Sequence, residues 1–263
     1  MTQDLMPNDV SVFPIPAFTD NYIWCLHNAD QAVVVDPGDA QPVMEYLKKN
    51  ALSLAAVLIT HHHHDHTGGI ARLVSANPNV PVIGPRGNHI RGITKSVSQG
   101  DTVHLPVLSL KFSVIETPGH TLDHIAFYGH GALFCGDTLF SAGCGRLFEG
   151  SPEQMLHSLN KFKRLPDDTI VYCTHEYTQA NVAFAKAVEP DNAELQAYSD
   201  WADAQRDNDV PTLPTDIKTQ KAINPFLRSR LPEIKESLTS HWGKAPVNDV
   251  DAFAGVRRWK DEF

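Results

Sequence analysis

Four side chains within six consecutive residues have the types and spacing of metal ligands. His61, His63, Asp65 and His66 form the pattern His-x-His-x-Asp-His. Imidazole nitrogens and carboxylate oxygens bind zinc, iron and other first-row divalent metals. Because alternate residues of an extended segment point the same way, His61 and His63 can bind one ion. Asp65 and His66 stand where we expect a helix to begin, so they can reach a second ion.

Three further candidate ligands share one structural setting. Each follows, within a few residues, a segment that we expect to be a strand: His120, Asp137 and His175. Seven nitrogen and oxygen ligands are too many for one tetrahedral ion, and they suit two ions that share a carboxylate. We assign no metal to the other nine histidines, and alternation along the extended segment should turn His62 and His64 away from the ions.

The elements that must position these ligands follow from hydrophobic runs and turn residues. Strands are predicted over residues 10–15, 22–26, 32–35, 54–60, 110–116, 124–128, 132–135 and 169–173. Helices are predicted over residues 41–50, 67–75, 151–165, 178–188, 191–206 and 231–241. Ser151 and Asp191 are the expected N-caps of two of these helices. The segment Gly129–Gly131 predicts a hairpin loop.

Strands dominate up to about residue 175, and helices dominate after it. We therefore expect an α/β domain over residues 1–176 that carries the metal site, and a small all-α domain over residues 177–263. The length of 263 residues suits one large domain with a small one. The composition, 42% hydrophobic and 20% charged, is that of a globular protein and excludes extensive disorder.

Charge and composition exclude several classes of partner. A net charge of −9 argues against a general binder of nucleic-acid phosphates. No apolar run approaches the length of about 20 residues that spans a bilayer. Residues 1–10 lack the basic and apolar regions of an export signal. Four scattered cysteines indicate reduced thiols. We expect a cytoplasmic monomer that acts on a small molecule, with no nucleic-acid or membrane partner.

The ligand pattern resembles that of the metallo-β-lactamase superfamily, and other segments resemble one family within it. These segments are Phe18–Tyr22, Asp36–Gly38, Gly143–Arg146, His175–Thr178, Asn224–Arg228 and Val256–Phe263. They are similar to segments of the hydroxyacylglutathione hydrolases (glyoxalase II) and extend over nearly the whole chain. The resemblance implies an α/β fold of the αββα sandwich type, a dinuclear metal site and a small all-α C-terminal domain.

The resemblance also implies a role for each ligand. The first metal would be bound by His61, His63 and His120. The second metal would be bound by Asp65, His66 and His175. A carboxylate bridge between the two would come from Asp137. Two divalent ions per chain are implied, zinc before iron or manganese. Asp65 would also orient the attacking hydroxide, which makes it the predicted catalytic residue.

The resemblance further implies a glutathione site. Its residues would be Arg146, Phe148, Tyr177, Arg257 and Lys260. Glutathione carries two carboxylates, which Arg and Lys bind through charge-assisted hydrogen bonds. Three positions depart from the family pattern. Arg146 stands where some members carry Lys, Phe148 where some carry Tyr, and Thr174 where Gly or Ala is frequent. Phe148 therefore brings no hydroxyl to the substrate.

The implied reaction is the hydrolysis of S-D-lactoylglutathione to D-lactate and glutathione, the second step of methylglyoxal detoxification. The thiolate leaving group needs no dedicated general acid, because a thiol has a pKa of about 8.5. Cys144 is an alternative nucleophile, but no histidine partner for it is identifiable in the sequence. Other metal-dependent functions on the same scaffold are alternatives: a lactonase, a β-lactamase, a phosphodiesterase, a persulfide dioxygenase or a metal-storage protein.

Overall fold

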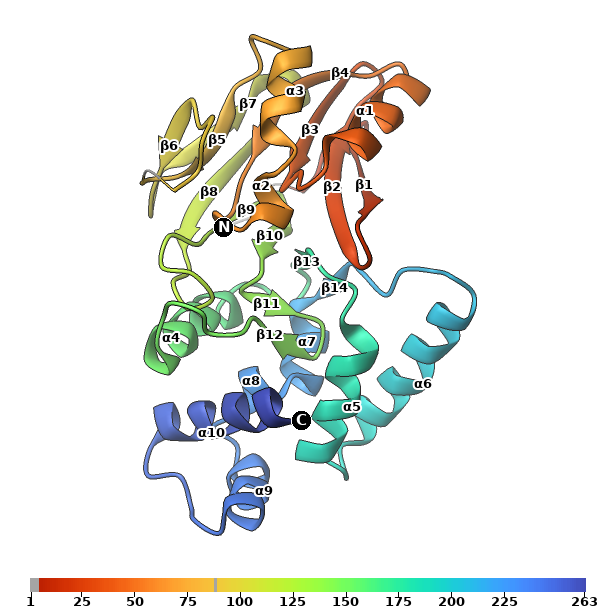
Figure 1. Ribbon diagram of the computed structural model, residues 1–263. Coiled ribbons are helices and arrows are strands. Elements are labelled where there is room, and N and C mark those ends of the chain that lie inside the picture. The colour runs from red at the N-terminus through yellow and green to blue at the C-terminus, as the bar shows by residue number, and fades with distance from the viewer. Residues whose placement is uncertain (1–4, 88) are drawn as a thin grey trace. The chain divides into compact units, whose positions relative to one another are not determined.

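The computed structural model describes residues 5–87 and 89–263 (Figure 1). Residues 1–4, the start of the N-terminal segment interpreted above, lie outside the described residues. The chain forms two compact units. The first unit contains the chain up to Glu116 together with Asp123–Gly136, and the second contains Thr117–Leu122 and Asp137–Phe263. In the described chain, no helix combines the length and the apolar character needed to cross a membrane.

The first unit contains two layers of strands. One sheet has six strands in sequence order: β1 (Ser11–Ala17), β2 (Asn21–His27), β3 (Gln31–Val35), β4 (Ser53–Leu58), β5 (Val82–Pro85) and β6 (Lys95–Val97). Its first three strands are antiparallel, and β3 to β6 are parallel. The second layer is an antiparallel meander of β7 (Thr102–Leu105), β8 (Leu110–Glu116), β9 (Ile125–Gly129) and β10 (Ala132–Gly136). A 3₁₀ turn, Pro106–Leu108, joins β7 to β8.

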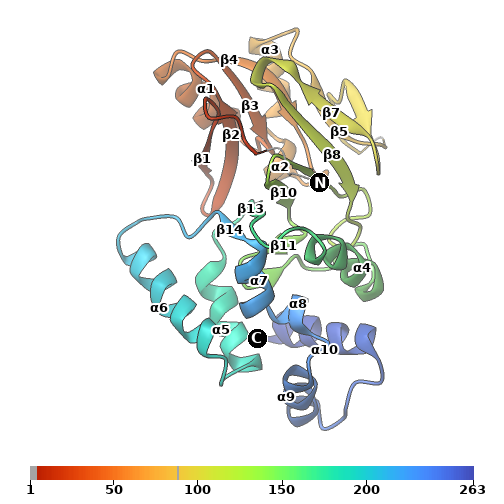
Figure 2. The same cartoon turned by 180° about the vertical axis from the view of Figure 1, so that it is seen from behind.

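Side-chain alternation explains how these layers pack. On β2, Ile23 and Cys25 belong to the apolar core that includes buried residues of α1 (Ala40–Lys49) and α3 (Ile70–Ala76). Trp24 and Leu26 point to the opposite face and are buried as well. The six-stranded sheet is therefore covered on both faces, as parallel strands require. By contrast, β8, whose ribbon is seen in Figure 2, buries alternate residues and exposes polar residues between them.

The predicted hairpin loop is confirmed. Gly129 pairs with Ala132 across β9 and β10, so His130 and Gly131 form a two-residue loop. Their φ angles are 53° and 72°, in the left-handed region. Positive φ at both central residues matches the twist of the flanking strands, and glycine adopts it without steric cost.

The second unit is mainly helical. Its strands form two antiparallel pairs: β11 (Leu139–Phe140) with β12 (Gly143–Cys144), and β13 (Ile170–Cys173) with β14 (Thr215–Asp216). Its helices are α4 (Pro152–Lys163), α5 (Thr178–Val188), α6 (Ala193–Asp207), α7 (Ile217–Ile223), α8 (Pro225–Arg228), α9 (Pro232–Trp242) and α10 (Asp249–Glu262). Figure 1 shows them in green to dark blue.

Most expected helices form, with two corrections at their ends. The capping box at Ser151 is present in full at the start of α4. The cap of α6, however, is Asn192, whose side chain accepts from the Leu195 amide, and the expected cap at Asp191 was wrong. The helix predicted over residues 67–75 is divided into α2 (His64–Thr67) and α3 at a glycine pair. There, the Gly69 amide donates to the Pro37 carbonyl at 2.9 Å.

Candidate metal centre

The segment from His61 to His66 connects the end of β4 to the short helix α2. His61 and His66 are fully buried, and their ring centroids are 4.1 Å apart. The ring of His63 lies 4.7 Å from that of His61. His62 instead places Nδ1 2.9 Å from Asp123, and His64 is exposed. The first unit thus brings together His61, His63 and His66, the three histidines of this segment that the sequence predicted as ligands.

Asp36 fixes the orientation of two of these rings from a buried position. Its Oδ2 accepts from Thr60 Oγ1 at 2.7 Å and from His66 Nδ1 at 3.0 Å. Because the Thr60 hydroxyl proton is used in this way, its oxygen accepts from His61 Nδ1 at 3.1 Å. Both neutral rings therefore carry their proton on Nδ1 and their lone pair on Nε2. A metal-binding histidine has this arrangement, with an outer partner on its second nitrogen.

The Asp36-Pro37-Gly38 segment brings this carboxylate against α2, the short helix that carries Asp65 and His66. Asp36 has a φ of 53°, which an aspartate tolerates better than most residues do. A Cβ at Gly38 would lie 1.8 Å from the backbone oxygen of Asp65. Only glycine permits that approach. The turn therefore places the Asp36 carboxylate within hydrogen-bond distance of His66, while Gly38 packs on the Asp65 backbone.

Asp65 and His66 are separated by a distance that suits shared metal coordination. Asp65 Oδ2 lies 3.4 Å from His66 Nε2, which is beyond the usual 2.7–3.2 Å range of a hydrogen bond. Two ligand atoms of a tetrahedral zinc, each about 2.0–2.1 Å from the ion, are about 3.3 Å apart. Asn21 donates to the same oxygen of Asp65 at 3.0 Å and so fixes the carboxylate.

The second unit contains the other three predicted ligands. Nε2 of His120 and Nε2 of His175 each lie 3.4 Å from the same oxygen, Oδ2 of Asp137. One carboxylate oxygen with two imidazole nitrogens at this separation is the arrangement expected of a ligand between two ions. His120 Nδ1 lies 2.8 Å from the Arg146 carbonyl, which fixes its proton on Nδ1 and its lone pair on Nε2.

The Gly-Cys-Gly-Arg loop is packed tightly against these ligands. A Cβ at Gly145 would lie 2.0 Å from the Asp137 backbone oxygen and 3.0 Å from His120 Nδ1. Asn224 holds the start of the loop by donating to the Gly143 carbonyl at 2.9 Å. The loop therefore has little freedom, and it presents the Arg146 backbone to His120 and the Arg146 side chain to the exterior.

Two partly exposed aromatic residues flank the candidate ligand histidines of this unit. Tyr177 stacks on His175 with ring centroids 4.6 Å apart and an interplanar angle of 6°. Phe148 contacts His120 edge to face at 5.2 Å. Phe148 is 61% exposed and Tyr177 is 37% exposed. Rings this accessible offer apolar surface to a ligand.

The basic residues expected at the glutathione site lie together in the second unit. Arg257, on α10, donates to the Cys144 carbonyl at 2.9 Å and to Asp261 Oδ1 at 3.0 Å. Arg146 donates through Nε to that same carboxylate oxygen at 3.2 Å. Lys260 donates to the Ala180 carbonyl at 3.0 Å. Arg257 is buried, whereas the Arg146 side chain is 57% exposed.

The Cys144 thiol is not suited to nucleophilic attack. Burial raises its pKa to about 11, and the nearby Arg257 only partly opposes that rise. The thiolate is the reactive form of cysteine, so a thiol with this pKa is almost entirely inactive at neutral pH. This agrees with the lack of an identifiable histidine partner for Cys144 in the sequence.

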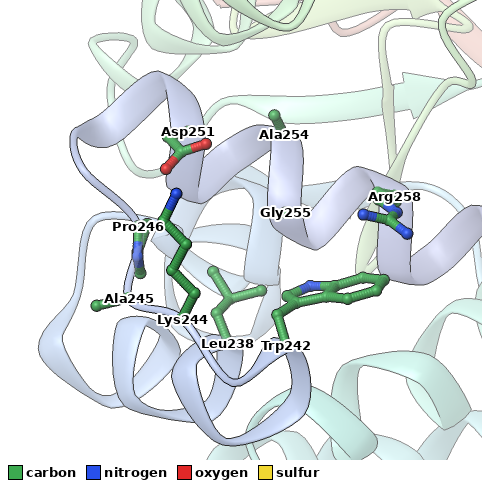
Figure 3. Close-up of a pocket in the computed structure, with 9 residues that line it drawn as sticks. All are labelled: Leu238, Trp242, Lys244, Ala245, Pro246, Asp251, Ala254, Gly255 and Arg258. Atoms are coloured by element: carbon green, nitrogen blue, oxygen red, sulfur yellow. The ribbon is translucent and has the colours of Figure 1, made fainter.

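A separate cavity lies between α9 and α10, with a volume of about 330 Å³ (Figure 3). Trp242 and Leu238 line it from α9, and Arg258 and Asp251 line it from α10. Arg258 lies over the Trp242 ring, 4.2 Å from its centroid. None of the predicted site residues is among the described residues that line this cavity, so we do not assign the cavity to the reaction.

Several supporting residues were not assigned a role from the sequence. Asp36 and Asn21 lie within the family-like segments, but neither is a ligand in the expected pattern. His124 was assigned no metal, yet it is buried and stacks on His61 at 4.7 Å. Asp261 stands in the family-like tail, and only the structure shows that it joins two arginines. For Asp36, Asn21 and Asp261, the available sequence signal was their position in a family-like segment. His124 had no such signal.

Comparison with known proteins identifies the family. Residues 18–175 match the family described as "Metallo-beta-lactamase superfamily", and residues 176–263 match "Hydroxyacylglutathione hydrolase C-terminus". A protein of Pseudoalteromonas translucida named hydroxyacylglutathione hydrolase is 54% identical over 97% of this chain and 100% of its own length. One of Nitrosomonas eutropha with the same name is 50% identical over 97% of this chain and 99% of its own.

The fold is similar to that of solved structures. The crystal structure of ETHE1 from Myxococcus xanthus has a TM-score of 0.63 and 23% identity, over 97% of this chain and 99% of its own. The two family matches, of which the second covers the mainly helical residues 176–263, agree with this similarity. Together they confirm the expected fold class, an αββα metallo-β-lactamase type with a helical C-terminal part. That fold and the His and Asp groups support a dinuclear site for divalent metals. The chain belongs to the hydroxyacylglutathione hydrolases, a family of the metallo-β-lactamase superfamily.

Proposed function

We propose that this chain hydrolyses the thioester bond of 2-hydroxyacylglutathiones, and that S-D-lactoylglutathione gives D-lactate and glutathione. The observation that carries the proposal is the arrangement at Asp137, whose Oδ2 lies 3.4 Å from Nε2 of both His120 and His175. It supports a shared carboxylate between two ions, beside exposed aromatic and cationic side chains. The names of the relatives, at 50–54% identity, support the choice of a glutathione thioester as substrate.

We propose two divalent ions, zinc first, with iron and manganese as alternatives. The first would be held by His61, His63 and His120. The second would be held by Asp65, His66 and His175. The bridging ligand would be Asp137. The fixed Nδ1 partners of His61, His66 and His120 support this set, because they leave Nε2 to donate. When bound, such ions acidify a water and polarise a carbonyl group.

The chain itself would orient the nucleophile and need do little for the leaving group. Asn21 holds the Asp65 carboxylate at 3.0 Å, so Asp65 can accept a hydrogen bond from the attacking water in a fixed direction. The glutathione thiolate departs without a general acid, because the pKa of a thiol is about 8.5. Asp65 is therefore the residue that we propose as catalytic, in addition to its role as a ligand.

We propose that glutathione binds to the second unit through Arg146, Phe148, Tyr177, Arg257 and Lys260. In a chain with a net charge of −9, a ligand with two carboxylates needs a local group of cations. Phe148 and Tyr177 add exposed rings beside the ligand histidines. Arg257 would contribute through the loop and the carboxylate that it holds, since its Nη atoms already contact Cys144 and Asp261.

We also propose that residues 1–176 and 177–263 are the two domains, which is supported by family matches that meet between residues 175 and 176. The compact units divide the chain at other positions, because residues 117–122 and 137–176 group with the second unit. We further propose that the protein is a monomer in the cytoplasm. The four cysteines are buried thiols, which suits a reducing compartment. Light scattering tests the monomer.

The test is hydrolysis of S-D-lactoylglutathione, measured beside a simple lactone and a β-lactam, with metal content determined on the same sample. Efficient turnover of the thioester with about two ions per chain supports the proposal. Preference for the lactone or the β-lactam contradicts the substrate assignment. Metal binding without turnover of any of the three indicates a storage protein, and a single iron with oxygen consumption indicates a dioxygenase.

A further inference from the structure

We propose that Asp261 is a positioning residue for the glutathione site, which it serves by holding the Arg146 side chain toward the substrate. The inference rests on the proposed function. Asp261 is the third residue from the C-terminus of the chain and belongs to the last turn of α10. Its carboxylate would not touch the substrate, and its effect on affinity would pass through the arginine.

A series of hydrogen bonds connects the loop that contains Cys144 and Arg146 to helix α10, through Arg257 and Asp261. Arg257 Nη1 donates to the Cys144 carbonyl at 2.9 Å, and its Nη2 donates to Asp261 Oδ1 at 3.0 Å. Arg146, two residues after Cys144, donates through Nε to the same Oδ1 at 3.2 Å. One carboxylate oxygen thus joins the arginine of the loop to the arginine of the helix.

The two arginines differ in what they can offer a ligand. Arg257 is 6% exposed, lies over the Phe226 ring at 5.0 Å and uses both Nη groups internally. Arg146 is exposed and is held through Nε, so the outer end of its guanidinium, with two Nη groups, can bind a carboxylate in a bidentate manner. Fixing Nε reduces the conformational entropy that the long side chain loses when it binds.

Asp261 also offsets local repulsion among cations. Lys260 precedes it on α10, and the pKa of Lys260 is lowered by burial first and then by Arg257, while Asp261 opposes the decrease. Without the carboxylate, Arg146 would share the site with two other cations and would tend to turn toward solvent. A neutral residue at position 261 should therefore lower the affinity for glutathione, because Arg146 is no longer held toward the substrate.

The loop itself does not depend on Asp261 for its fold. Asn224 donates to the Gly143 carbonyl at 2.9 Å and to the Phe140 carbonyl at 3.1 Å. Asn181 donates to the Ser141 carbonyl at 3.0 Å. These buried amides hold the loop from other helices, so Asp261→Asn should leave the loop and the metal ligands in place.

The experiment compares Asp261→Asn with a matched control, Glu262→Gln. Glu262 pairs with Arg258 four residues before it, as Asp261 pairs with Arg257, and the Arg258–Glu262 pair is exposed. KM and kcat are measured for S-D-lactoylglutathione and for the lactoyl thioester of N-acetylcysteamine, which lacks both carboxylates. Both substitutions are also made in an Arg146→Ala background.

We expect Asp261→Asn to raise KM for S-D-lactoylglutathione about fivefold, the upper range for a partly exposed ion pair, with kcat unchanged. Glu262→Gln should change neither constant. The carboxylate-free thioester should not distinguish Asp261→Asn from wild type, and in the Arg146→Ala background the effect should disappear.

The inference is overturned if KM is unchanged in Asp261→Asn, if both thioesters lose rate equally, or if the effect persists without Arg146. Absence of thioester turnover by the wild-type chain contradicts the proposed function, and the inference falls with it. Normal wild-type turnover with an unaffected Asp261→Asn variant overturns the positioning role alone. The two failures are therefore distinguishable.

Discussion

Oδ2 of Asp36 accepts from Nδ1 of His66 at 3.0 Å, and both side chains are almost completely buried. The same carboxylate accepts from the amide and the hydroxyl of Thr60, each at 2.7 Å. Its charge is thus compensated by three hydrogen bonds, as a buried carboxylate requires. The consequence for His66 is a ring that Asp36 holds in one orientation, with Nδ1 toward the carboxylate.

Asp36→Asn should therefore weaken metal binding without removing a ligand. An asparagine can present its amide nitrogen to His66 and favour the other tautomer, so we expect metal affinity to fall about 10- to 100-fold. Competition with a chromophoric chelator measures this directly. Asp30→Asn, at an exposed position of the same unit, is the control and should leave affinity unchanged. Equal affinities for the two variants would contradict the role of Asp36.

Gly38→Ala should destabilise the protein more than alanine at an unobstructed glycine. A Cβ at Gly38 would lie 1.8 Å from the Asp65 backbone oxygen, so the loop must move, at a cost of about 2–3 kcal/mol. At Gly100, with a φ of +86°, no atom lies within 4 Å, and Gly100→Ala should cost only about 1 kcal/mol of conformational strain. Denaturant unfolding compares them, and equal losses would show that the contact with Asp65 is unimportant.

Lys260→Ala should raise KM for S-D-lactoylglutathione more than it lowers kcat, because the ammonium is expected to bind glutathione remote from the reacting carbonyl. Lys244→Ala, at an exposed position before α10, is the control. Burial lowers the pKa of Lys260, so its charge is lost as pH rises through a range below that of an ordinary lysine. In wild type, KM should accordingly rise with pH in that range. A steep fall in kcat with constant KM would contradict the role.

The Cys144 thiol should make folding sensitive to alkaline pH. Its pKa is raised from 9.0 to about 11, so the folded state retains a proton that the unfolded state loses. The contribution to stability is full below about pH 9 and is lost as pH rises toward 11, by at most about 1.4 kcal/mol per pH unit. Cys144→Ala should show a shallower decline in the free energy of unfolding over this interval. Parallel declines would contradict burial of the thiol.

The candidate metal ligands could be selected from the sequence because their types and spacing are restrictive. Four of them lie within six residues, and the other three follow strands that apolar runs revealed. The supporting contacts could not be selected in this way. The pairing of Asp36 with His66 joins residues 30 positions apart, and it depends on how a Pro-Gly turn packs on α2. No local pattern encodes such a contact.

The fold was predictable where local signals were strong. Helix α5 was predicted with its observed ends, and the N-cap of α4 was recognised at Ser151. Helix α10 was missed, because its buried apolar residues are only Ala252, Phe253 and Val256, and it also buries the arginine Arg257. Strands β5 to β7 were also missed, since they contain only three or four residues each. Tertiary packing, rather than local propensity, stabilises such short elements.

The most informative measurement is a metal titration of the metal-free protein, in which hydrolysis of S-D-lactoylglutathione and bound metal are followed together for wild type and Asp137→Asn. Oδ2 of Asp137 lies 3.4 Å from Nε2 of both His120 and His175, so one substitution should weaken both metal positions. Wild-type activity should rise until two ions are bound per chain, and Asp137→Asn should lose metal and activity together. Full activity at one ion per chain, or an active Asp137→Asn variant, would contradict a dinuclear thioester hydrolase.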